Sequence, residues 1–310
     1  MALSSIKLLQ TLEWAKRFIF QRPTAIGNFN EPAISSANTI LQTIVGAPFV
    51  WPWNRAVIGF ICTPGVQDYV VFNWQATTAI PVGYVLVDSN GNSQQVTTAG
   101  VTGTVIPTWN PTTGQTTVES GMGGATWTNL GPIGLSNGAT AYNFGWIESA
   151  SVKATMPNTG TQEWKEISMK IGLGVDSVRS RPHSISAQFI DANGNVTFRV
   201  MPTPDIAYPV SLTIQQKPPL FTNLNQTWAP IPDSYSHIYN WGLLSLLYMF
   251  SDDVRFQVAN QKFIAHLLSA NQGLSETERN IWLNNWQSVT STQQILPMVI
   301  QQGFSGRQAI

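Results

Sequence analysis

The feature of the sequence that most constrains its fold is a long central stretch almost without charge. No lysine or arginine occurs between residues 55 and 153, and Asp88 and Glu119 are the only charged residues between 73 and 145. The stretch is rich in glycine, threonine and serine, a composition typical of short strands joined by turns. We therefore predict that residues 74–144 form a small β-sandwich, inserted into a host domain made of residues 1–73 and 145–310.

Amphipathic helices are predicted at the N-terminal end. The first spans residues 4–20 and places one stripe of side chains together: Ser5, Leu8, Leu12, Ala15 and Ile19. The second begins near Asn30, with Pro32 in its first turn, and ends at Gly46. Its inward side chains are Ala33, Ala37, Ile40, Leu41 and Ile44.

Strands are predicted on either side of the neutral stretch. Residues 56–62 and 68–74 are expected to pair with each other through a type II turn at Pro64-Gly65. After residue 144 the host domain continues with an Asp191-Ala192-Asn193-Gly194 hairpin turn and with five further strands: 146–154, 163–171, 184–190, 196–201 and 210–216.

The last third is predicted to be helical again, over residues 234–250, 252–271 and 276–289. Ser275 and Glu278 have the spacing of a capping box, and Gly273 is expected to close the helix before it. The fold class is thus α+β, with a helical bundle built from the N- and C-terminal helices, an antiparallel β domain and an inserted all-β module of Ig-like or sandwich type. The bundle is expected to bury Tyr235, Tyr239, Leu243, Phe256 and Phe263, while residues 294–310 extend from it.

The overall charge indicates a protein that assembles through shape. Sixteen basic residues balance sixteen acidic ones, and only 10% of the residues are charged, so no net field attracts nucleic acid or anionic lipid. Twelve tryptophans on so weakly charged a chain favour a surface that other subunits cover.

Compartment and membrane signals are few. The longest apolar run, Trp241 to Phe250, is about half the ~20 residues that a spanning helix needs. The N-terminus lacks a basic segment followed by an apolar one, and Cys62 is the only cysteine, which excludes an internal disulfide. We expect synthesis in the cytoplasm, with Cys62 packed as a small hydrophobic residue.

No set of residues predicts catalysis, a metal or a cofactor. His183, His237 and His266 have no partner at ligand spacing. The Gly172-Leu173-Gly174 sequence is not followed by the Gly-Lys-Ser/Thr of a phosphate loop. Glu163 and Glu166 would point to opposite faces of a strand, and no nucleophile has a nearby base. We predict that the protein is not an enzyme.

Two groups of residues are candidates for binding. Arg179 and Arg181 form a tight basic pair before Pro182, which could contact DNA phosphates in a channel or make ion pairs between subunits. Trp74, Trp109 and Trp127 could stack on sugar rings or fill a small core. The Pro-rich segment 228–233 is predicted to be an extended arm able to lie across a neighbouring subunit.

Several motifs of the host domain together resemble a known family. They are Phe49-Val50-Trp51-Pro52-Trp53-Asn54-Arg55, Gly65-Val66-Gln67-Asp68-Tyr69, Arg199-Val200-Met201-Pro202-Thr203-Pro204-Asp205 and Trp228-Ala229-Pro230-Ile231-Pro232-Asp233 before a helix. The chain resembles the head-to-tail connector subunits of tailed phages, in particular the adaptor (tail tubular protein A) type of short-tailed phages, over residues 1–73 and about 145–310. The resemblance implies a ring of twelve subunits in the neck of the virion, bound below the portal protein. Such a ring continues the DNA channel to a downstream tail or nozzle protein without reading DNA sequence and without a membrane.

The central stretch is similar to a small β module of many phage structural proteins. The similar segments are 81–84, 88–91, 107–109 and 127–131. The module could contact the capsid, brace tail spikes or fibres, or bind surface sugars. Two alternatives to the adaptor therefore stay open: another neck or tail-hub component, and a carbohydrate-binding or host-recognition protein.

Overall fold

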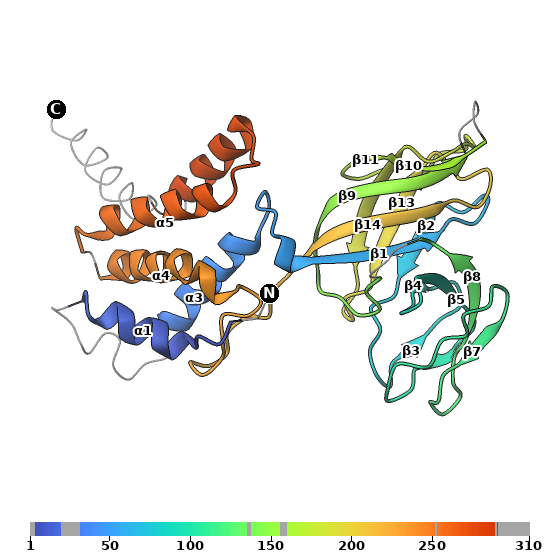
Figure 1. Cartoon of the computed structure of the whole chain (residues 1–310), viewed down its shortest axis with the longest axis horizontal. Helices are drawn as coiled ribbons and strands as arrows, with labels where there is room; N and C mark the ends of the chain where they lie inside the picture. The colour runs from blue at the N-terminus through green and yellow to red at the C-terminus, as the bar shows by residue number, and fades with distance from the viewer. Residues whose placement is uncertain are drawn as a thin grey trace, which may run out of the picture. The chain divides into compact units, whose positions relative to one another are not determined.

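The structure, a computed structural model, describes residues 4–19, 32–134, 138–155, 160–251, 253–288 and 290. It contains helices together with antiparallel and mixed sheets, so the predicted α+β class is confirmed. The chain divides into two compact units (Figure 1). The helical unit comprises Met1–Trp53 and Pro218–Ile310, and the β unit comprises Asn54–Lys217.

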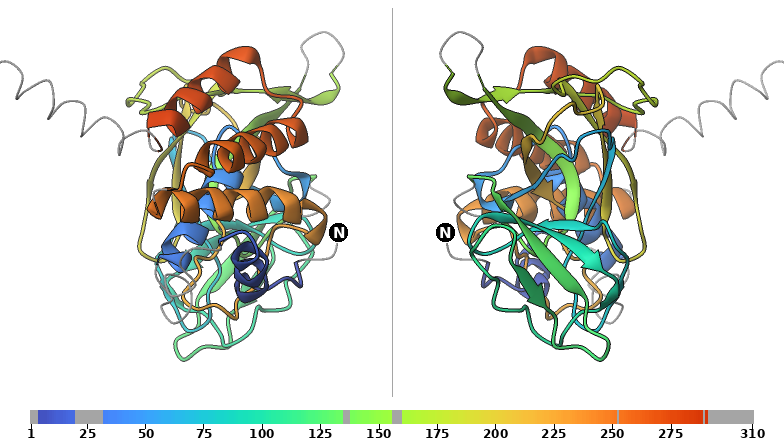
Figure 2. Two further views of the ribbon diagram at one scale, coloured as in Figure 1. Left: turned by 90° about the vertical axis from the view of Figure 1, so that its left-hand side faces the viewer. Right: turned by 90° about the vertical axis from the view of Figure 1, so that its right-hand side faces the viewer.

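The helical unit takes its helices from both ends of the chain. They are α1 (Leu8–Lys16), α3 (Ala33–Val45), the 3-10 helix η2 (Asp233–Tyr235), α4 (Ser236–Phe250), α5 (Phe256–Ala270) and a helix over residues 276–288. α4 and α5 lie side by side, and α4 also contacts α1 and α3 (Figure 2). α4 has no Asp, Glu, Lys or Arg, as its central position requires.

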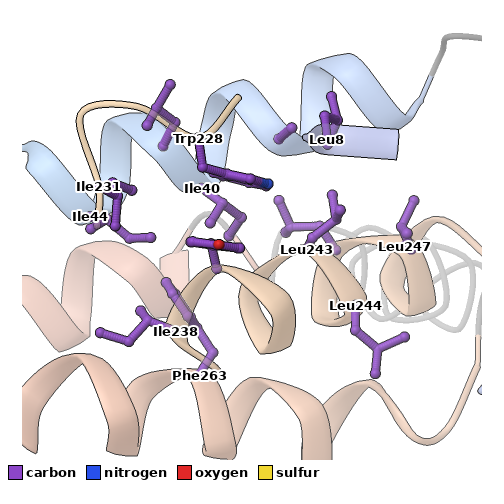
Figure 3. Close-up of a cluster of buried hydrophobic side chains, with 14 of the residues drawn as sticks. Leu8, Ile40, Ile44, Trp228, Ile231, Ile238, Leu243, Leu244, Leu247 and Phe263 are labelled. Carbon is purple, nitrogen blue, oxygen red and sulfur yellow. The ribbon is translucent and has the colours of Figure 1, made fainter. Parts of the chain in front are cut away.

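One hydrophobic core joins the helices of the two chain ends (Figure 3). Trp228 stacks on Tyr239 of α4, with ring centroids 4.4 Å apart and an interplanar angle of 7°. Among the predicted inward residues, Ser5 is exposed and that prediction is wrong, because the first helix begins only at Leu8. The others are all buried: Leu8, Leu12, Ala15, Ile19, Ala33, Ala37, Ile40, Leu41 and Ile44. The predicted bundle of N- and C-terminal helices is confirmed.

The ends of the predicted helices are less accurate. α5 ends at Ala270 with Asn271 as its C-cap, so Gly273 does not close it and that prediction is wrong. The capping box before the next helix is confirmed, because the Ser275 N–H and hydroxyl donate to Glu278 Oε2 at 2.9 and 2.7 Å. The expected helix start at Asn30 and the tail 294–310 lie outside the described residues.

The β unit is built from fourteen short strands in the part of the chain that the structure describes. They are β1 (Arg55–Ile61), β2 (Asp68–Val71), β3 (Ala79–Ile80), β4 (Val85–Val87), β5 (Asn92–Thr98), β6 (Gly100–Val101), β7 (Thr116–Val118), β8 (Thr126–Pro132), β9 (Phe144–Thr155), β10 (Gln162–Glu166), β11 (Ser168–Met169), β12 (Ser184–Ile190), β13 (Val196–Met201) and β14 (Pro209–Gln216). The sheets have the orders β1-β14-β9-β10, β11-β12-β13-β2-β4-β5-β8-β7 and β3-β6.

The predicted pairing of the first two strands is wrong. β1 pairs with β14, from Arg55 opposite Gln215 to Ile61 opposite Pro209. β2 lies in the other sheet, antiparallel to β13 and parallel to β4. The predicted turn between them forms, with Gly65 at φ 80°, but it carries the chain from one sheet to the other. A buried core lies between those sheets, where Phe60 stacks on Tyr69 at 4.5 Å.

The same change of sheet divides another predicted strand. Residues 163–171 form β10 and β11, in different sheets, with the buried Ile167 between them. The strands predicted at 184–190 and 196–201 match β12 and β13, and the hairpin turn at 191–194 joins them. Strands β9 and β14 are also present: β9 extends beyond its predicted range by two residues at its start and one at its end, and β14 by one residue at its start.

The neutral stretch has its own small core but shares its sheet with the host strands. Phe72, Ile80, Leu86, Val96, Trp109, Ala125 and Trp127 form that core. Strands β4, β5, β8 and β7 continue the sheet that contains β13 and β2. The boundaries after residues 73 and 144 fall inside the β unit, and a separate module at 74–144 stays a prediction.

Membrane insertion through a helix has no candidate in the described residues. None of their helices combines the length and the apolar character needed to span a bilayer.

Candidate functional site

The predicted basic pair lies at one end of the β unit, where three connections meet. They are the β1–β2 turn, residues 172–181 and the Pro-rich segment after β13. The Gly65 N–H donates to Pro204 O at 2.8 Å, and the Ser180 N–H donates to Thr203 O at 2.9 Å. These bonds frame an open pocket of about 580 Å³, which Arg179 lines together with Gly65, Val66, Gln67, Asp68, Val175, Asp176, Ser177 and Thr203.

A neighbouring arginine is already neutralised. Arg199 Nε and Nη2 each donate to the Asp68 carboxylate at 2.7 Å, and Nη1 donates to Leu173 O at 3.1 Å. The hydrogen bond to Asp68 raises the pKa of the Arg199 guanidinium. By contrast, Arg179 and Arg181 are exposed and make no ion pair with any described residue. These two cations are therefore available to a partner.

Exposed aliphatic side chains surround this pair in the same three connections. Val175 is 81% exposed and Val178 59% exposed. Val66 and Ile206 add exposed side chains from the other two connections, and Ile171 from the start of the middle one. Aliphatic and guanidinium groups on one surface are typical of protein–protein contacts. We call residues 62–67, 170–181 and 202–208 together the loop end of the β unit.

The three tryptophans of the neutral stretch point into its core. Trp109 and Trp127 are 4% and 0% exposed, with ring centroids 5.6 Å apart. The Nε1 atoms of Trp74 and Trp127 each donate to Glu119 Oε1 at 3.1 Å. Neither Trp109 nor Trp127 therefore presents a ring face on which a sugar could stack. Trp109 and Trp127 thus lie in a small core, against which the half-buried Trp74 packs.

Two hairpin turns have the same sequence pattern, Asp-x-Asn-Gly-Asn, at residues 88–92 and 191–195. Asp88 Oδ1 accepts the N–H groups of Asn90 and Asn92 at 2.8 and 2.9 Å. Asp191 Oδ1 accepts those of Asn193 and Asn195, both at 2.9 Å. Each carboxylate thus stabilises its own turn. In the part of the chain that the structure describes, no group of three His, Cys, Asp or Glu residues is placed to hold a metal ion.

Two of the three histidines lie close together, on two different helices. His237 on α4 and His266 on α5 have ring centroids 4.9 Å apart. The helix pairing, which sequence spacing cannot reveal, brings them together. Burial, then His237 and Lys262, lower the pKa of His266. His183 lies in the β unit, where its Nδ1 contacts Ser184 Oγ at 3.0 Å.

The Pro-rich segment 228–233 packs within its own chain, so the prediction of an arm across a neighbour is wrong. Trp228 is fully buried, and its Nε1 donates to Thr11 Oγ1 at 2.9 Å. The Asp233 carboxylate accepts the hydroxyls of Ser4 and Ser5, both at 2.7 Å, and the Ser5 N–H. Apolar contacts and a carboxylate thus fix the N-terminal residues to this segment.

Cys62 is buried, as predicted, and is not a candidate nucleophile. Burial raises the pKa of its thiol to about 12. The reactive species of cysteine is the thiolate, which is scarce at neutral pH under these conditions.

Comparison with known proteins supplies the context for these surfaces. Residues 125–291 match the family model described as SU10 adaptor protein. The match begins at β8, continues through α4 and α5, and ends after the helix at 276–288. No curated protein matches the chain.

Proposed function

Because this chain belongs to the SU10 adaptor protein family, a family of structural proteins of phages, we propose that it forms the ring that joins portal to tail in a phage virion. The family match, which covers more than half of the chain, is the observation that carries the proposal. As a virion component, the protein would lie at the head-to-tail junction and continue the DNA channel.

The surface chemistry supports assembly into a closed ring. Identical subunits that contact head to tail close into a ring when the rotation per subunit divides a full turn. The loop end of the β unit offers exposed aliphatic side chains and two arginines that make no ion pair with any described residue. We propose twelve subunits, with portal protein on one side, a tail or nozzle protein on the other, and tail spikes or fibres as further neighbours.

Arg179 and Arg181 are proposed to act in this ring in one of two ways. They contact DNA phosphates in the channel, or they pair with carboxylates of an adjacent subunit. Replacing both by glutamine separates the two roles. If the two arginines contact DNA phosphates, the glutamine variant forms the ring normally and only the passage of DNA through the channel changes. If they pair with an adjacent subunit, the variant fails to form the ring.

The direct test mixes the purified full chain with portal rings and images the product by negative stain. We expect a ring of the added chain on one face of the portal. Association with a tail protein but never with portal would contradict the proposal and indicate another neck or tail-hub component. Specific binding on a glycan array with no affinity for either would indicate a host-recognition protein instead.

A further inference from the structure

Helices α4 and α5 meet along a row of two side-chain pairs. His237 of α4 lies against His266 of α5, with ring centroids 4.9 Å apart and an interplanar angle of 80°. One helical turn further along, Lys262 Nζ of α5 lies 4.1 Å from the centroid of the Trp241 ring of α4. Since residue 237 pairs with 266 and 241 with 262, the two helices run antiparallel and both pairs belong to one row. We call these four residues the seam.

The seam covers part of the core of the helical unit. Ile238 and Phe263, the sequence neighbours of His237 and Lys262, are both fully buried. The Trp241 ring also packs edge-on against Trp14 of α1, with ring centroids 5.5 Å apart. Separation of α4 from α5 along the seam would therefore bring water to the core of the helical unit.

The two helices of the seam offer no negative charge. α4 has no Asp, Glu, Lys or Arg, and Lys262 is the only such residue of α5. The seam therefore already holds one positive charge when both histidines are neutral. A protonated histidine would add a second charge of the same sign, and neither helix has a carboxylate to pair with it.

The nearest carboxylates along the chain are engaged elsewhere. Asp233, four residues before His237, accepts the hydroxyls of Ser4 and Ser5. Asp253, before the start of α5, pairs with Arg255. The remaining charged residues of α1 and of the helix over residues 276–288 are Glu13, Lys16, Glu276, Glu278 and Arg279.

The surroundings of His266 all favour its neutral form. Burial lowers the pKa of His266 below the usual 6.5, and the charges of His237 and Lys262 lower this pKa further. These two are the charged groups of the described residues that act on it. Both are cations or become cations in acid, so their effect grows as the pH falls.

We propose that the seam is a pH-sensitive contact: protonation of both histidines places three positive charges in one row and loosens the packing of α4 on α5. The inference is independent of the adaptor function. The unfolded chain binds the proton of His266 more tightly than the folded chain does, so the stability of the helical unit should fall as the pH drops below about 6.5 and through the lower folded-state pKa. Above that range both histidines are neutral and the seam stays closed.

The first test follows the histidine ring signals of the full chain by NMR as the pH is lowered from about 8 to about 5. His237→Gln and Lys262→Gln each remove a positive charge from the seam, and each should raise the pKa of His266. A His266 pKa that is unchanged in both variants overturns the inference.

The second test measures the thermal midpoint of the helical unit at about pH 7.5 and about pH 5.5. Glutamine cannot take up a proton, so the His266→Gln midpoint should rise relative to that of the wild type at the lower pH, by on the order of 2 °C. His183→Gln is the matched control, because it removes an exposed histidine of the β unit and leaves the seam intact. Its offset from the wild type should be the same at both pH values.

Two outcomes of the second test contradict the inference. In one, the offset between His266→Gln and the wild type is the same at both pH values. In the other, the offset of His183→Gln changes as much as that of His266→Gln. Neither test uses the portal protein, so failure to bind portal contradicts only the adaptor function.

Discussion

At the scale of single residues, hydrogen-bond donors determine whether the neutral stretch can bury its two carboxylates, Asp88 and Glu119. A carboxylate is normally exposed, so the sequence places Asp88 and Glu119 on the surface by default. In the structure both are buried, and each accepts three hydrogen bonds. The donors to Asp88 lie within six residues of it, whereas Glu119 depends on donors from distant residues such as Trp74 and Gly103, which no local pattern reveals.

Glu119→Gln tests the buried carboxylate. The amide NH₂ of glutamine would face N–H donors, which leaves a buried polar group unsatisfied at a cost of about 1–3 kcal/mol. We expect a lower thermal midpoint for the β unit by differential scanning calorimetry. Exposed Glu166→Gln is the control and should change stability by less than about 0.5 kcal/mol. Equal midpoints for both variants would contradict the role of Glu119.

Asp233 predicts a pH dependence for the attachment of the N-terminal residues. Hydrogen bonds from Ser4 and Ser5 lower the pKa of its carboxyl below the usual 3.8. A group with a lowered folded-state pKa stabilises the fold above its unfolded pKa, and that contribution is lost as the pH falls through the folded value. Asp233→Asn should therefore lower the thermal midpoint of the helical unit at pH 7, and the difference from the wild type should shrink near pH 3.

Glu13→Gln serves as the comparison for this variant, because Glu13 is an exposed carboxylate of the same unit. We expect its midpoint to follow that of the wild type at both pH values. A difference between Asp233→Asn and the wild type that stays constant down to pH 3 would show that charge is not the cause.

At the scale of elements, the sequence predicts what local chemistry controls. Hairpin β12–β13 matches its prediction because Asp191, Asn193 and Gly194 form the turn themselves. The partner of β1 could not be predicted, because β14 is more than 140 residues away in the chain and several strands share its alternating pattern. The arginine pair was found as a sequence motif, but the loop end around it comes from tertiary contacts.

Gly194→Ala tests the hairpin turn. Gly194 has φ 77°, a left-handed conformation that costs other residues about 1–2 kcal/mol, and a Cβ there would lie 3.1 Å from Asn73 Nδ2. We expect a destabilisation of that order in urea unfolding. Gly174→Ala is the control, because no atom lies within 4 Å of the added Cβ and its φ is ordinary. The turn is less important than proposed if both variants unfold at the same urea concentration.

Gly242→Ala tests the close packing of α4. A Cβ at this position would lie 2.9 Å from Ile40 Cγ2 of α3 and 2.9 Å from Phe263 Cδ2 of α5. Overpacking a core typically costs about 1–3 kcal/mol. Although alanine favours helices, the Gly242→Ala protein should have a lower thermal midpoint by calorimetry, whereas Ser269→Ala, at an exposed residue of α5, should not. A more stable Gly242→Ala protein would show that the helices separate without cost.

At the scale of the whole molecule, the chain divides after Trp53 and after Lys217, and the module predicted at residues 74–144 lies inside the β unit, where it stays a prediction. The change in charge near residues 73 and 145 indicated a boundary, whereas the compact β unit spans Asn54–Lys217. Its first and last strands pair from Arg55 opposite Gln215. Because the first and last strands of the β unit pair with each other, the unit is closed on itself and has its own core.

A chain limited to residues 54–217 should therefore fold alone. We expect a cooperative thermal transition and a β-type circular dichroism spectrum. Deleting residues 74–144 from the full chain should expose the edge of β2, which β4 covers, and promote aggregation. An unfolded 54–217 fragment, or a deletion variant as soluble as the wild type, would favour the boundaries at 73 and 145 instead.

The side-by-side ends of the β unit also matter for how such proteins diversify. The chain leaves the helical unit at Trp53 and returns to it at Pro218, and the first and last strands of the β unit are neighbours in one sheet. The two connections therefore start about one strand spacing, ~4.8 Å, apart. Recombination can exchange or enlarge the β unit while the helical unit keeps its sequence. A lineage can thus acquire new β-unit surfaces while its helical unit is unchanged.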